Sequence, residues 1–347
     1  MQIAGELIDD KIIVKKSNDV GRLYNKSSLG KPLTGNKLEL NLLEGVFLLG
    51  EGKIRIFRNK SEVNFQELVK LASKSVTEFE IKYLVFRDLR NRGHAIKLCE
   101  DDTTTFCQAK EKDEKQFLIL AISERDKLDL DGIINLTRNV EKKDRELWIG
   151  IVDEEGDITY YVVSFLDTKG KNKEHIFQKT SGVLLKDRVA VFDKNASKEL
   201  LEKEFYGKPF GDGLQLSLVE TIYLIEKGFI DVETSEGKKL SKDKFENIAL
   251  TLQPDIKPRL EVFKDLKKRG LIVKTGFKFG TNFRAYTTKP GDTHAEYLIH
   301  VLDRDFKGTW AEISRAVRLA HSVNKEIAFA TIDNSKIEYI KFGRLRP

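Results

Sequence analysis

The chain has 347 residues, of which 33% are charged and 40% hydrophobic, and its formal net charge is +6. This length suits about two or three domains, and no apolar run approaches the ~18–20 residues that span a bilayer, so we expect no membrane segment. The chain starts without the pattern of a signal peptide, and its two cysteines, Cys99 and Cys107, match neither a disulfide framework nor a zinc motif. We therefore expect a cytoplasmic protein, whose modest basic excess would suit a nucleic-acid partner.

The first predicted elements, a short strand around KIIVKK and two helices, recur later in the chain. Residues 38–54 (LELNLLEGVFLLGEGKI) and 214–230 (LQLSLVETIYLIEKGFI) are identical at seven of seventeen positions. Residues 82–97 and 259–274 are identical at seven of sixteen. The two offsets, 176 and 177 residues, are nearly equal, which indicates a tandem duplication.

The second copy repeats this order of elements. A strand at RVAVFD precedes an apolar helix, with residues at helical spacing from Leu218 to Ile225 and a C-cap at Gly228. A second helix runs through Val262–Leu266 and ends at Gly270, after which LIVKT is typical of a strand. Strands of alternating polarity and one further helix follow. We predict a mixed α+β and α/β fold, in which each repeat is a small α+β N-terminal lobe followed by a nuclease-like α/β lobe.

The copies diverge after these helices. We place a three-residue gap in GFKFGTNF, beyond which the offset is 180 and Asp153 matches Asp333. On this register a tyrosine, a histidine and a lysine occur only in the second copy: Tyr286 against Phe106, His294 against Glu114, and Lys325 against Arg145. The split predicts one active copy and one structural copy.

The segment from Leu166 to Gly182 is polar and rich in lysine, so we interpret it as a solvated tether between the copies. The predicted domains are the N-lobe of the inactive repeat (1–97), its degenerate, non-catalytic α/β lobe (98–168), the linker (169–181), the N-lobe of the active repeat (182–270) and the catalytic α/β lobe (271–347).

The chemistry open to Tyr, His and Lys is the cleavage of RNA without a metal or cofactor. The ribose 2′-OH can attack the adjacent phosphorus if a base removes its proton and an acid protonates the departing 5′-oxygen. A histidine suits the acid, a lysine offsets charge on the phosphoryl oxygens, and a tyrosine near cations can become a useful base. The products would be a 2′,3′-cyclic phosphate and a 5′-hydroxyl, and DNA would be inert.

Three stretches carry a family resemblance: VFKDLKKRGLIVKTGFKFGTNFRAY, HAEYLIHV and RAVRLAHSVNKEIAFA. They resemble the archaeal tRNA-intron splicing endonucleases, in the homodimeric class whose subunits fuse an inactive and an active unit. The resemblance implies that Tyr286 is the general base, His294 the general acid and Lys325 the transition-state cation. It also implies that Arg318 and Arg344 grip a bulged RNA base through cation–π stacking.

The same resemblance implies a tRNA-intron lyase that acts on precursor tRNA. Its substrate would be the bulge-helix-bulge at exon–intron junctions, cut at two symmetric sites by a homodimer. An acidic loop of the inactive unit would dock on the catalytic unit of the other subunit. The loop DEEGD supplies the candidate residues, which are Asp153, Glu154, Glu155 and Asp157.

Two other functions remain open at this stage. A catalytically inactive RNA-binding or scaffolding homologue is possible because the first repeat shows that the fold tolerates loss of the three residues. A metal-dependent nuclease would need Asp292 and Glu296 to cluster with further acids. Two histidines have no assigned role: we expect a packing or surface position for His300 and an interior position for His321.

Overall fold

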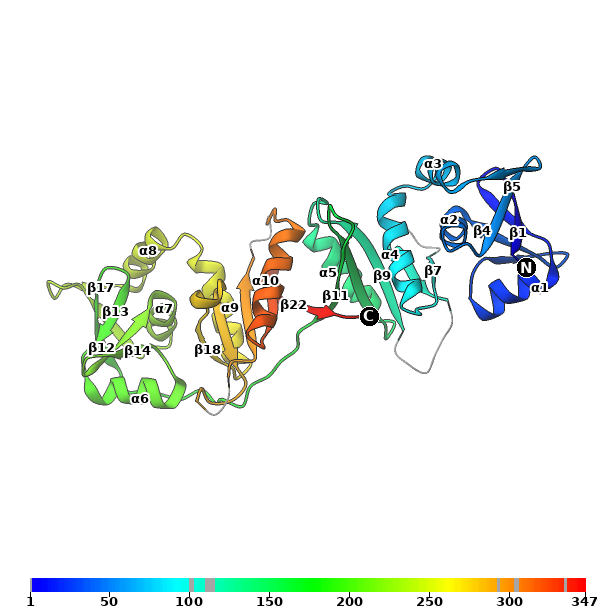
Figure 1. Ribbon diagram of the computed structural model, residues 1–347. Helices are drawn as coiled ribbons and strands as arrows, with labels where there is room; N and C mark the ends of the chain where they lie inside the picture. Colours follow the sequence, from blue (N-terminus) through cyan, green and yellow to red (C-terminus); the bar gives the residue numbers. More distant parts are fainter. Residues whose placement is uncertain (1, 100–102, 110–115, 292–293, 303–305, 334–335) are drawn as a thin grey trace. The chain divides into compact units, whose positions relative to one another are not determined.

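The computed structural model describes residues 2–99, 103–109, 116–291, 294–302, 306–333 and 336–347, and the chain divides into two compact units. Unit 1 comprises Met1–Ser164, Gly308–Ala311 and Arg344–Pro347, and unit 2 comprises Phe165–Lys307 and Glu312–Gly343. Each unit contains one copy of the same succession of helices and strands (Figure 1). The predicted duplicated α+β architecture is confirmed.

Each unit begins with an N-lobe built on a six-stranded sheet, in the order β3-β4-β2-β1-β5-β6 in unit 1 and β14-β15-β13-β12-β16-β17 in unit 2. The elements of the first are β1 (Ile3–Ile8), β2 (Lys11–Val14), α1 (Ser17–Gly21), η1 (Arg22–Lys26), β3 (Lys31–Leu33), β4 (Lys37–Asn41), α2 (Leu42–Gly50), β5 (Ile54–Arg58), β6 (Ser61–Val63) and α3 (Phe65–Ser75). Those of the second are β12 (Thr180–Leu184), β13 (Arg188–Val191), α6 (Lys194–Glu204), β14 (Lys208–Phe210), β15 (Gly213–Ser217), α7 (Leu218–Glu226), β16 (Ile230–Glu233), β17 (Lys239–Leu240) and α8 (Lys242–Leu252).

A C-lobe follows, in which a helix packs on a mixed sheet. In unit 1 it comprises α4 (Phe79–Asn91), β7 (Ile96–Leu98), β8 (Phe106–Gln108), β9 (Phe117–Ser123), α5 (Leu130–Glu141), β10 (Glu146–Val152) and β11 (Ile158–Phe165). In unit 2 it comprises α9 (Ile256–Lys268), β18 (Ile272–Thr275), η2 (Phe277–Phe279), β19 (Phe283–Tyr286), β20 (Tyr297–Val301), α10 (Trp310–Ser322), β21 (Glu326–Asp333) and β22 (Lys336–Leu345). Strands β9 and β10 are parallel, as are β20 and β21, because a helix connects each pair.

The buried helix that starts each matched segment is fixed by the same device in both units. Glu44 of α2 accepts hydrogen bonds from the backbone N–H groups of Asn41 and Gly30, and Glu220 of α7 accepts them from Ser217 and Gly207. In each case the first residue of the pair is the N-cap, so the glutamate completes a capping box. The predicted helix end at Gly228 is confirmed by its positive φ of 77°.

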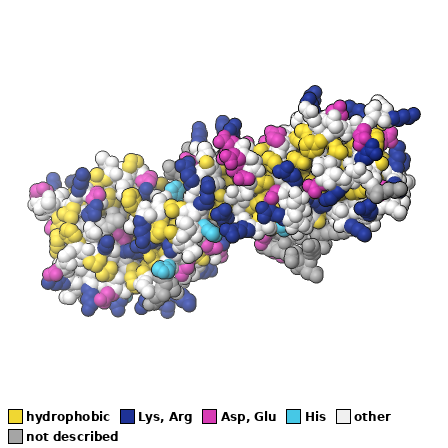
Figure 2. Space-filling view, viewed as in Figure 1, with side chains coloured by type: hydrophobic (Ala, Val, Ile, Leu, Met, Phe, Trp, Pro, Cys, Tyr) yellow, Lys and Arg dark blue, Asp and Glu magenta, His cyan; other side chains and the backbone are white. Residues whose placement is uncertain are grey.

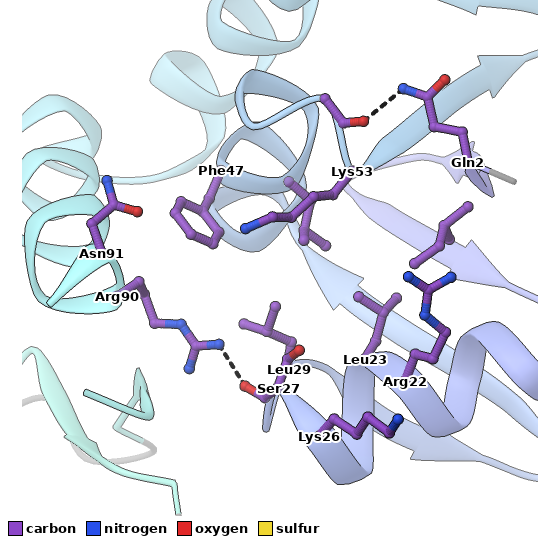
Figure 3. Close-up of a pocket in the computed structure, with 13 residues that line it drawn as sticks. Gln2, Arg22, Leu23, Lys26, Ser27, Leu29, Phe47, Lys53, Arg90 and Asn91 are labelled. Atoms are coloured by element: carbon purple, nitrogen blue, oxygen red, sulfur yellow. Dashed lines mark hydrogen bonds between the residues drawn. The ribbon is translucent and has the colours of Figure 1, made fainter. Parts of the chain in front are cut away.

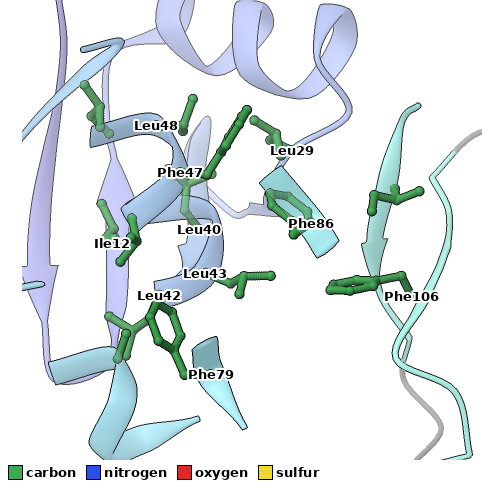
Figure 4. Close-up of a cluster of buried hydrophobic side chains, with 14 of the residues drawn as sticks. Ile12, Leu29, Leu40, Leu42, Leu43, Phe47, Leu48, Phe79, Phe86 and Phe106 are labelled. Carbon is green, nitrogen blue, oxygen red and sulfur yellow. The ribbon is translucent and has the colours of Figure 1, made fainter. Parts of the chain in front are cut away.

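A chain of aromatic rings links the two lobes of each unit and fixes the register between the repeats. In unit 1, Phe86 lies 5.5 Å from Phe47 and 5.8 Å from Phe106, as measured between ring centroids (Figure 4). In unit 2, Phe263 lies 5.5 Å from Tyr223 and 5.9 Å from Phe283. The structural counterpart of Phe106 is therefore Phe283.

This finding corrects the predicted pairing of Phe106 with Tyr286. Phe106 is the strand partner of Ile119, and Phe283 is the strand partner of the equivalent Ile299. Ala109 donates its backbone N–H to Ala95, and Tyr286 is the strand partner of Ile272, which is the counterpart of Ala95. The loop GFKFGTN thus has a full-length counterpart, and the three-residue gap lies after Tyr286. The counterpart of Tyr286 is Ala109. The prediction was wrong because CEDDTTTFCQ and GFKFGTNFRA share few residues, so the sequence alignment left the position of the gap undetermined. Glu114 lies outside the described residues.

The predicted solvated tether is also wrong, although residues 166–179 contain no helix or strand. The backbone N–H groups of Gly170 and Asn172 donate to the carbonyls of Arg269 and Gly270, at 2.9 and 3.0 Å. A Cβ on Gly170 would lie 2.0 Å from the Gly270 oxygen, so only glycine permits this approach. Phe177 is 7% exposed and belongs to the unit 2 core. Strand β12 begins at Thr180, inside the predicted linker.

No helix among the residues that the structure describes is long and apolar enough to span a membrane. Basic and acidic side chains are interspersed over the face shown in Figure 2. The four boundaries between the five predicted domains stay predictions. Within them, α4 packs on β9 and β10, and α9 on β18 and β20.

Candidate active site

Tyr286, the predicted base, is the last residue of β19 and is 7% exposed. Its side chain packs with Ile272, Ala295 and Phe205, so strand, hairpin and N-lobe all hold the ring. The guanidinium carbon of Arg284 lies 5.8 Å from the centroid of the tyrosine ring. Because side chains alternate along a strand, Arg284 and Tyr286 share one face of β19.

His294, the predicted acid, is exposed and lies directly before the buried Ala295. The hairpin that connects it to Tyr286 is closed by Glu296. The Glu296 carboxylate accepts hydrogen bonds from the backbone N–H of Thr287 at 3.0 Å and from its hydroxyl at 2.8 Å. The backbone N–H of Lys171 donates to the Thr287 carbonyl at 3.1 Å, so the packed linker also supports the hairpin.

Lys325, the predicted cation, follows α10, where its backbone N–H donates to the Ala320 carbonyl at 2.9 Å. Its ammonium donates to the carbonyl of Ala295 at 3.0 Å and lies 5.6 Å from the centroid of the Phe279 ring. Desolvation, with the nearby charges of Lys278 and Arg284, holds the pKa of Lys325 below its ordinary value, while Glu296 opposes this shift.

Ala295 is the point at which the three residues meet. The ring of Tyr286 packs on it, the ammonium of Lys325 bonds to its carbonyl, and His294 precedes it in the chain. The structure therefore places Tyr286, His294 and Lys325 around one residue, although the sequence separates them by up to 39 positions. Such a set can remove one proton, deliver another and offset negative charge between them.

The two predicted RNA-gripping arginines differ in their surroundings. Arg318 is exposed on α10, and its Nε donates to the Ser314 carbonyl of its own helix at 3.4 Å. Arg344 is exposed near the end of β22 and belongs to unit 1. Their role in RNA binding stays a prediction.

The acidic loop of Asp153, Glu154, Glu155 and Asp157 is an exposed turn between β10 and β11. The Asp153 carboxylate accepts the backbone N–H groups of Glu155 and Asp157 at 3.0 and 2.9 Å, which gives the turn a fixed shape. Glu154 forms an ion pair with Arg125 at 2.9 Å. The loop is thus preorganised and presents acid to solvent, and docking stays a prediction.

Both remaining histidines can be placed. His321 is exposed, so the expected interior position is wrong; it falls on the solvent side of an amphipathic helix. His300 is half-buried, with its ring 6.0 Å from that of Phe329. Burial and the charge of Arg259 lower the pKa of His300. This is the packing position that we expected.

No group of three or more His, Cys, Asp or Glu side chains suited to a metal ion occurs in the described part of the chain. Of the two acids considered for a metal site, Asp292 lies outside that part, and both carboxylate oxygens of Glu296 bond to Thr287. Two residues of the site were not predicted from the sequence: Glu296, which closes the hairpin, and Arg284, which lies beside Tyr286. Arg284 could have been found, because it lies two positions before Tyr286 in the predicted strand FRAY and therefore shares its face.

Known proteins match this chain over nearly its full length. The profile described as the N-terminal domain of tRNA intron endonucleases matches residues 3–69 and 180–246, and that of their catalytic C-terminal domain matches 79–160 and 256–339. The chain is 36% identical to the tRNA-splicing endonuclease of Methanococcoides burtonii, covering 98% of this chain and 99% of that protein. It is 34% identical to that of Methanosarcina barkeri at the same coverage, and 30% identical to that of Haloarcula marismortui over 94% of this chain and 95% of that protein.

Proposed function

The chain belongs to the tRNA intron endonuclease family, and from that premise we propose that it cuts precursor tRNA at bulge-helix-bulge exon–intron junctions. The observation that carries the proposal is the convergence of Tyr286, His294 and Lys325 on Ala295. The proposed activity is that of a tRNA-intron lyase, in which the ribose 2′-OH itself is the nucleophile.

The reaction moves two protons. Tyr286, as its phenolate, takes the proton of the 2′-OH, whose oxygen forms the new bond to phosphorus, and the bond from phosphorus to the 5′-oxygen breaks. His294 gives a proton to that leaving oxygen, and it is exposed, so substrate can reach it. Lys325 offsets charge on the phosphoryl oxygens, with its ammonium oriented by the Ala295 carbonyl. The ends produced are a 2′,3′-cyclic phosphate and a 5′-hydroxyl.

The test is cleavage of a bulge-helix-bulge RNA by the full chain in excess EDTA. We expect cutting at both junctions to continue, with cyclic phosphate at the new 3′ ends. An otherwise identical RNA with a 2′-deoxy sugar at each cut position should bind and stay intact. Cleavage of the deoxy substrate would refute the 2′-OH mechanism, and loss of cutting on chelation, with recovery on adding Mg²⁺, would refute metal independence.

We further propose that the chain works as a homodimer, since each chain holds one Tyr/His/Lys set and the proposed substrate has two cut sites. The exposed acidic loop at Asp153–Asp157 is the proposed contact to the catalytic unit of the partner. Light scattering of the wild type should give twice the chain mass. Reversal of the loop charges (Glu155→Lys with Asp157→Lys) should shift the mass towards the monomer, and a variant that stays dimeric would remove the loop from the interface.

A further inference from the structure

A cavity of about 600 Å³ lies within unit 1, between the N-lobe and the end of helix α4 (Figure 3). Its walls come from β1, η1, α2 and α4 and from the turn before β5. Within the described part of the chain its lining includes four cations and no acid; the cations are Arg22, Lys26, Lys53 and Arg90. The apolar part of the lining is Ile3, Leu23, Leu29, Phe47 and Leu48. The cavity thus combines positive charge with an apolar surface, at a volume usual for ligand sites.

Arg90 is half-buried, whereas the other three cations are exposed. Its Nη2 donates to the carbonyl of Ser27 at 2.5 Å, which is the contact drawn as a dashed line in Figure 3. Its Nη1 is buried and has no acceptor among the residues that the structure describes, and the side chain forms no ion pair with them. Buried donors normally find acceptors, so this guanidinium is suited to a ligand that brings an anionic oxygen.

The exposed cations are weakly paired. Arg22 and Lys26 form neither a side-chain hydrogen bond nor an ion pair with any described residue. Lys53 lies 3.6 Å from Glu51, with both side chains exposed, and its ammonium lies 5.5 Å from the centroid of the Phe47 ring. Like charges around one cavity repel one another, so a bound anion would stabilise all four cations together.

The second repeat does not keep this charge. The register that places Gly30 against Gly207 and Phe47 against Tyr223 gives the counterparts of Arg22, Lys53 and Ser27, which are Glu199, Phe229 and Glu204. Glu204 is paired with Lys267, the counterpart of Arg90. Unit 2 therefore neutralises its groove with its own carboxylates, and the positive charge of the cavity is a property of unit 1 and not of the shared fold.

We propose that the unit 1 cavity binds the phosphate of a nucleotide, with the base against the apolar lining. A phosphate offers several charged oxygens to the four cations, whereas a single carboxylate would leave most of them unpaired. Phe47 and the leucines beside it supply an apolar surface for the base. The nucleotide is either free or part of an RNA strand, since both present the same chemistry. The inference does not depend on the proposed cleavage, because the cavity lies in the repeat without the Tyr/His/Lys set.

The test is isothermal titration calorimetry of the full chain with AMP, compared with adenosine and with inorganic phosphate. We expect one AMP per chain, bound more tightly than adenosine or phosphate alone. Arg22→Glu, which introduces the residue of unit 2, should weaken AMP binding ~10-fold or more, the usual effect of a lost hydrogen bond to a charged group. The Arg22 side chain is exposed, so folding should be unaffected.

The matched control pair is Lys26→Ala and Lys203→Ala, because these exposed lysines hold the same position in the two repeats. Only Lys26→Ala should weaken AMP binding. A salt series with the deoxy bulge-helix-bulge RNA identifies the source of the nucleotide. If the strand supplies it, AMP competes with the RNA, and Lys26→Ala lowers the slope of log K against log salt by about 0.7–0.9. If the nucleotide is free, the slope is unchanged and AMP does not compete.

Equal affinity for AMP and adenosine, or AMP binding that Arg22→Glu and Lys26→Ala leave unchanged, would overturn the inference. Equally tight binding of a hexaglutamate peptide would identify a surface for acidic protein segments and overturn the nucleotide assignment. A wild type that cuts RNA but binds no AMP, with an RNA slope independent of Lys26, would overturn the cavity site alone. A wild type that never cuts, yet binds AMP through Arg22, would remove the proposed function and leave the cavity site.

Discussion

The two repeats keep the same structural cluster and differ in the chemistry beside it. In each C-lobe an aspartate of the long helix accepts a hydrogen bond from a sheet tyrosine and pairs with an arginine one turn on. The residues are Asp88, Tyr160 and Arg92 in unit 1, and Asp265, Tyr339 and Arg269 in unit 2. Burial and the aspartate raise the pKa of each tyrosine, so both phenols stay protonated. This cluster is therefore structural, and Tyr286 lies elsewhere, where unit 1 has Ala109.

The N-lobes differ in one groove. In unit 2 it is filled: the Glu174 carboxylate accepts the Tyr223 hydroxyl at 3.3 Å, His175 donates its backbone N–H to Glu204, and Phe177 packs on Tyr206 and Phe229. The linker thus contacts Glu204, Tyr206, Tyr223 and Phe229. In unit 1 the counterparts of these four residues line an open cavity of about 600 Å³ (Figure 3); they are Ser27, Leu29, Phe47 and Lys53. The same linker segment also supports the hairpin between Tyr286 and His294, because the backbone N–H of Lys171 donates to the Thr287 carbonyl. The repeats therefore differ in the packing of this segment as well as in the Tyr/His/Lys set.

The comparison is tested most severely at the histidine. His294→Ala should slow cleavage ~10²–10⁴-fold, the usual contribution of a general acid, while RNA binding stays nearly intact. His321→Ala, an exposed histidine of the same unit, is the control and should cut at the wild-type rate. The comparison would fail if binding and rate fell together in His294→Ala. Single-turnover rates and affinities for the deoxy RNA separate these outcomes.

Replacement of the buried cation beside each N-lobe groove should lower the free energy of unfolding by different amounts. Lys267 and Glu204 form an ion pair that is almost fully buried, and removal of one partner, as in Lys267→Met, should destabilise unit 2 by about 3–5 kcal/mol. Within the described part of the chain, the carbonyl of Ser27 is the acceptor of the counterpart Arg90, so Arg90→Met should cost unit 1 about 1–3 kcal/mol. Urea unfolding followed by hydrogen exchange in each unit measures both. Equal costs would contradict the distinction.

Lys325 and its counterpart Arg145 provide the third contrast. Lys325→Ala should lower the cleavage rate ~10²–10³-fold, because it removes a preorganised positive charge from the transition state. Arg145→Ala should leave the rate unchanged, since Ala109 replaces the tyrosine in that repeat. A rate loss of similar size in Arg145→Ala would show that both repeats take part in chemistry. Single-turnover kinetics at saturating enzyme gives both values.

The smallest expected effect is a pH dependence confined to unit 2. The pKa of His300 is lowered in the folded state, so the unfolded chain binds the proton first and stability falls as the pH drops below about 6.5. The first repeat has Leu120 at this position. His300→Leu should flatten the decline, which hydrogen exchange of unit 2 at several pH values would detect. A decline of unaltered slope in this variant would assign it to other groups.

Much of the fold could be predicted because duplication repeats the pattern. The helices from Leu218 and up to Gly270 were located by apolar spacing and glycine caps, and the same elements in the first repeat supported them. The register of β8 against β19 could not be predicted, since both strands are short and share few residues; the ring contacts of Phe106 and Phe283 and the strand pairing separate the alternatives. The packing of the linker could not be predicted, because the hydrogen bonds that tie it to the end of α9 and to Thr287 are made by main-chain groups, which carry no side-chain pattern.

The three proposed reacting groups could be named from the sequence, whereas the groups that hold them in place could not. Tyr286, His294 and Lys325 are chemically distinctive and missing from the twin sequence. Two groups position them. The main-chain carbonyl of Ala295 accepts the Lys325 ammonium, and the carboxylate of Glu296 accepts the backbone N–H of Thr287 in the hairpin. Neither has a composition signal, because any residue has a carbonyl and surface glutamates are common.

The bond from Lys325 to the Ala295 carbonyl has an evolutionary meaning. A main-chain acceptor survives any substitution that keeps the backbone in place, so the ammonium stays oriented while surrounding side chains drift. Loss of activity after a gene duplication then requires no damage to the scaffold. Under the proposed mechanism, one altered side chain at position 286 or 294 would end catalysis and leave a folded repeat free to acquire another task, such as assembly.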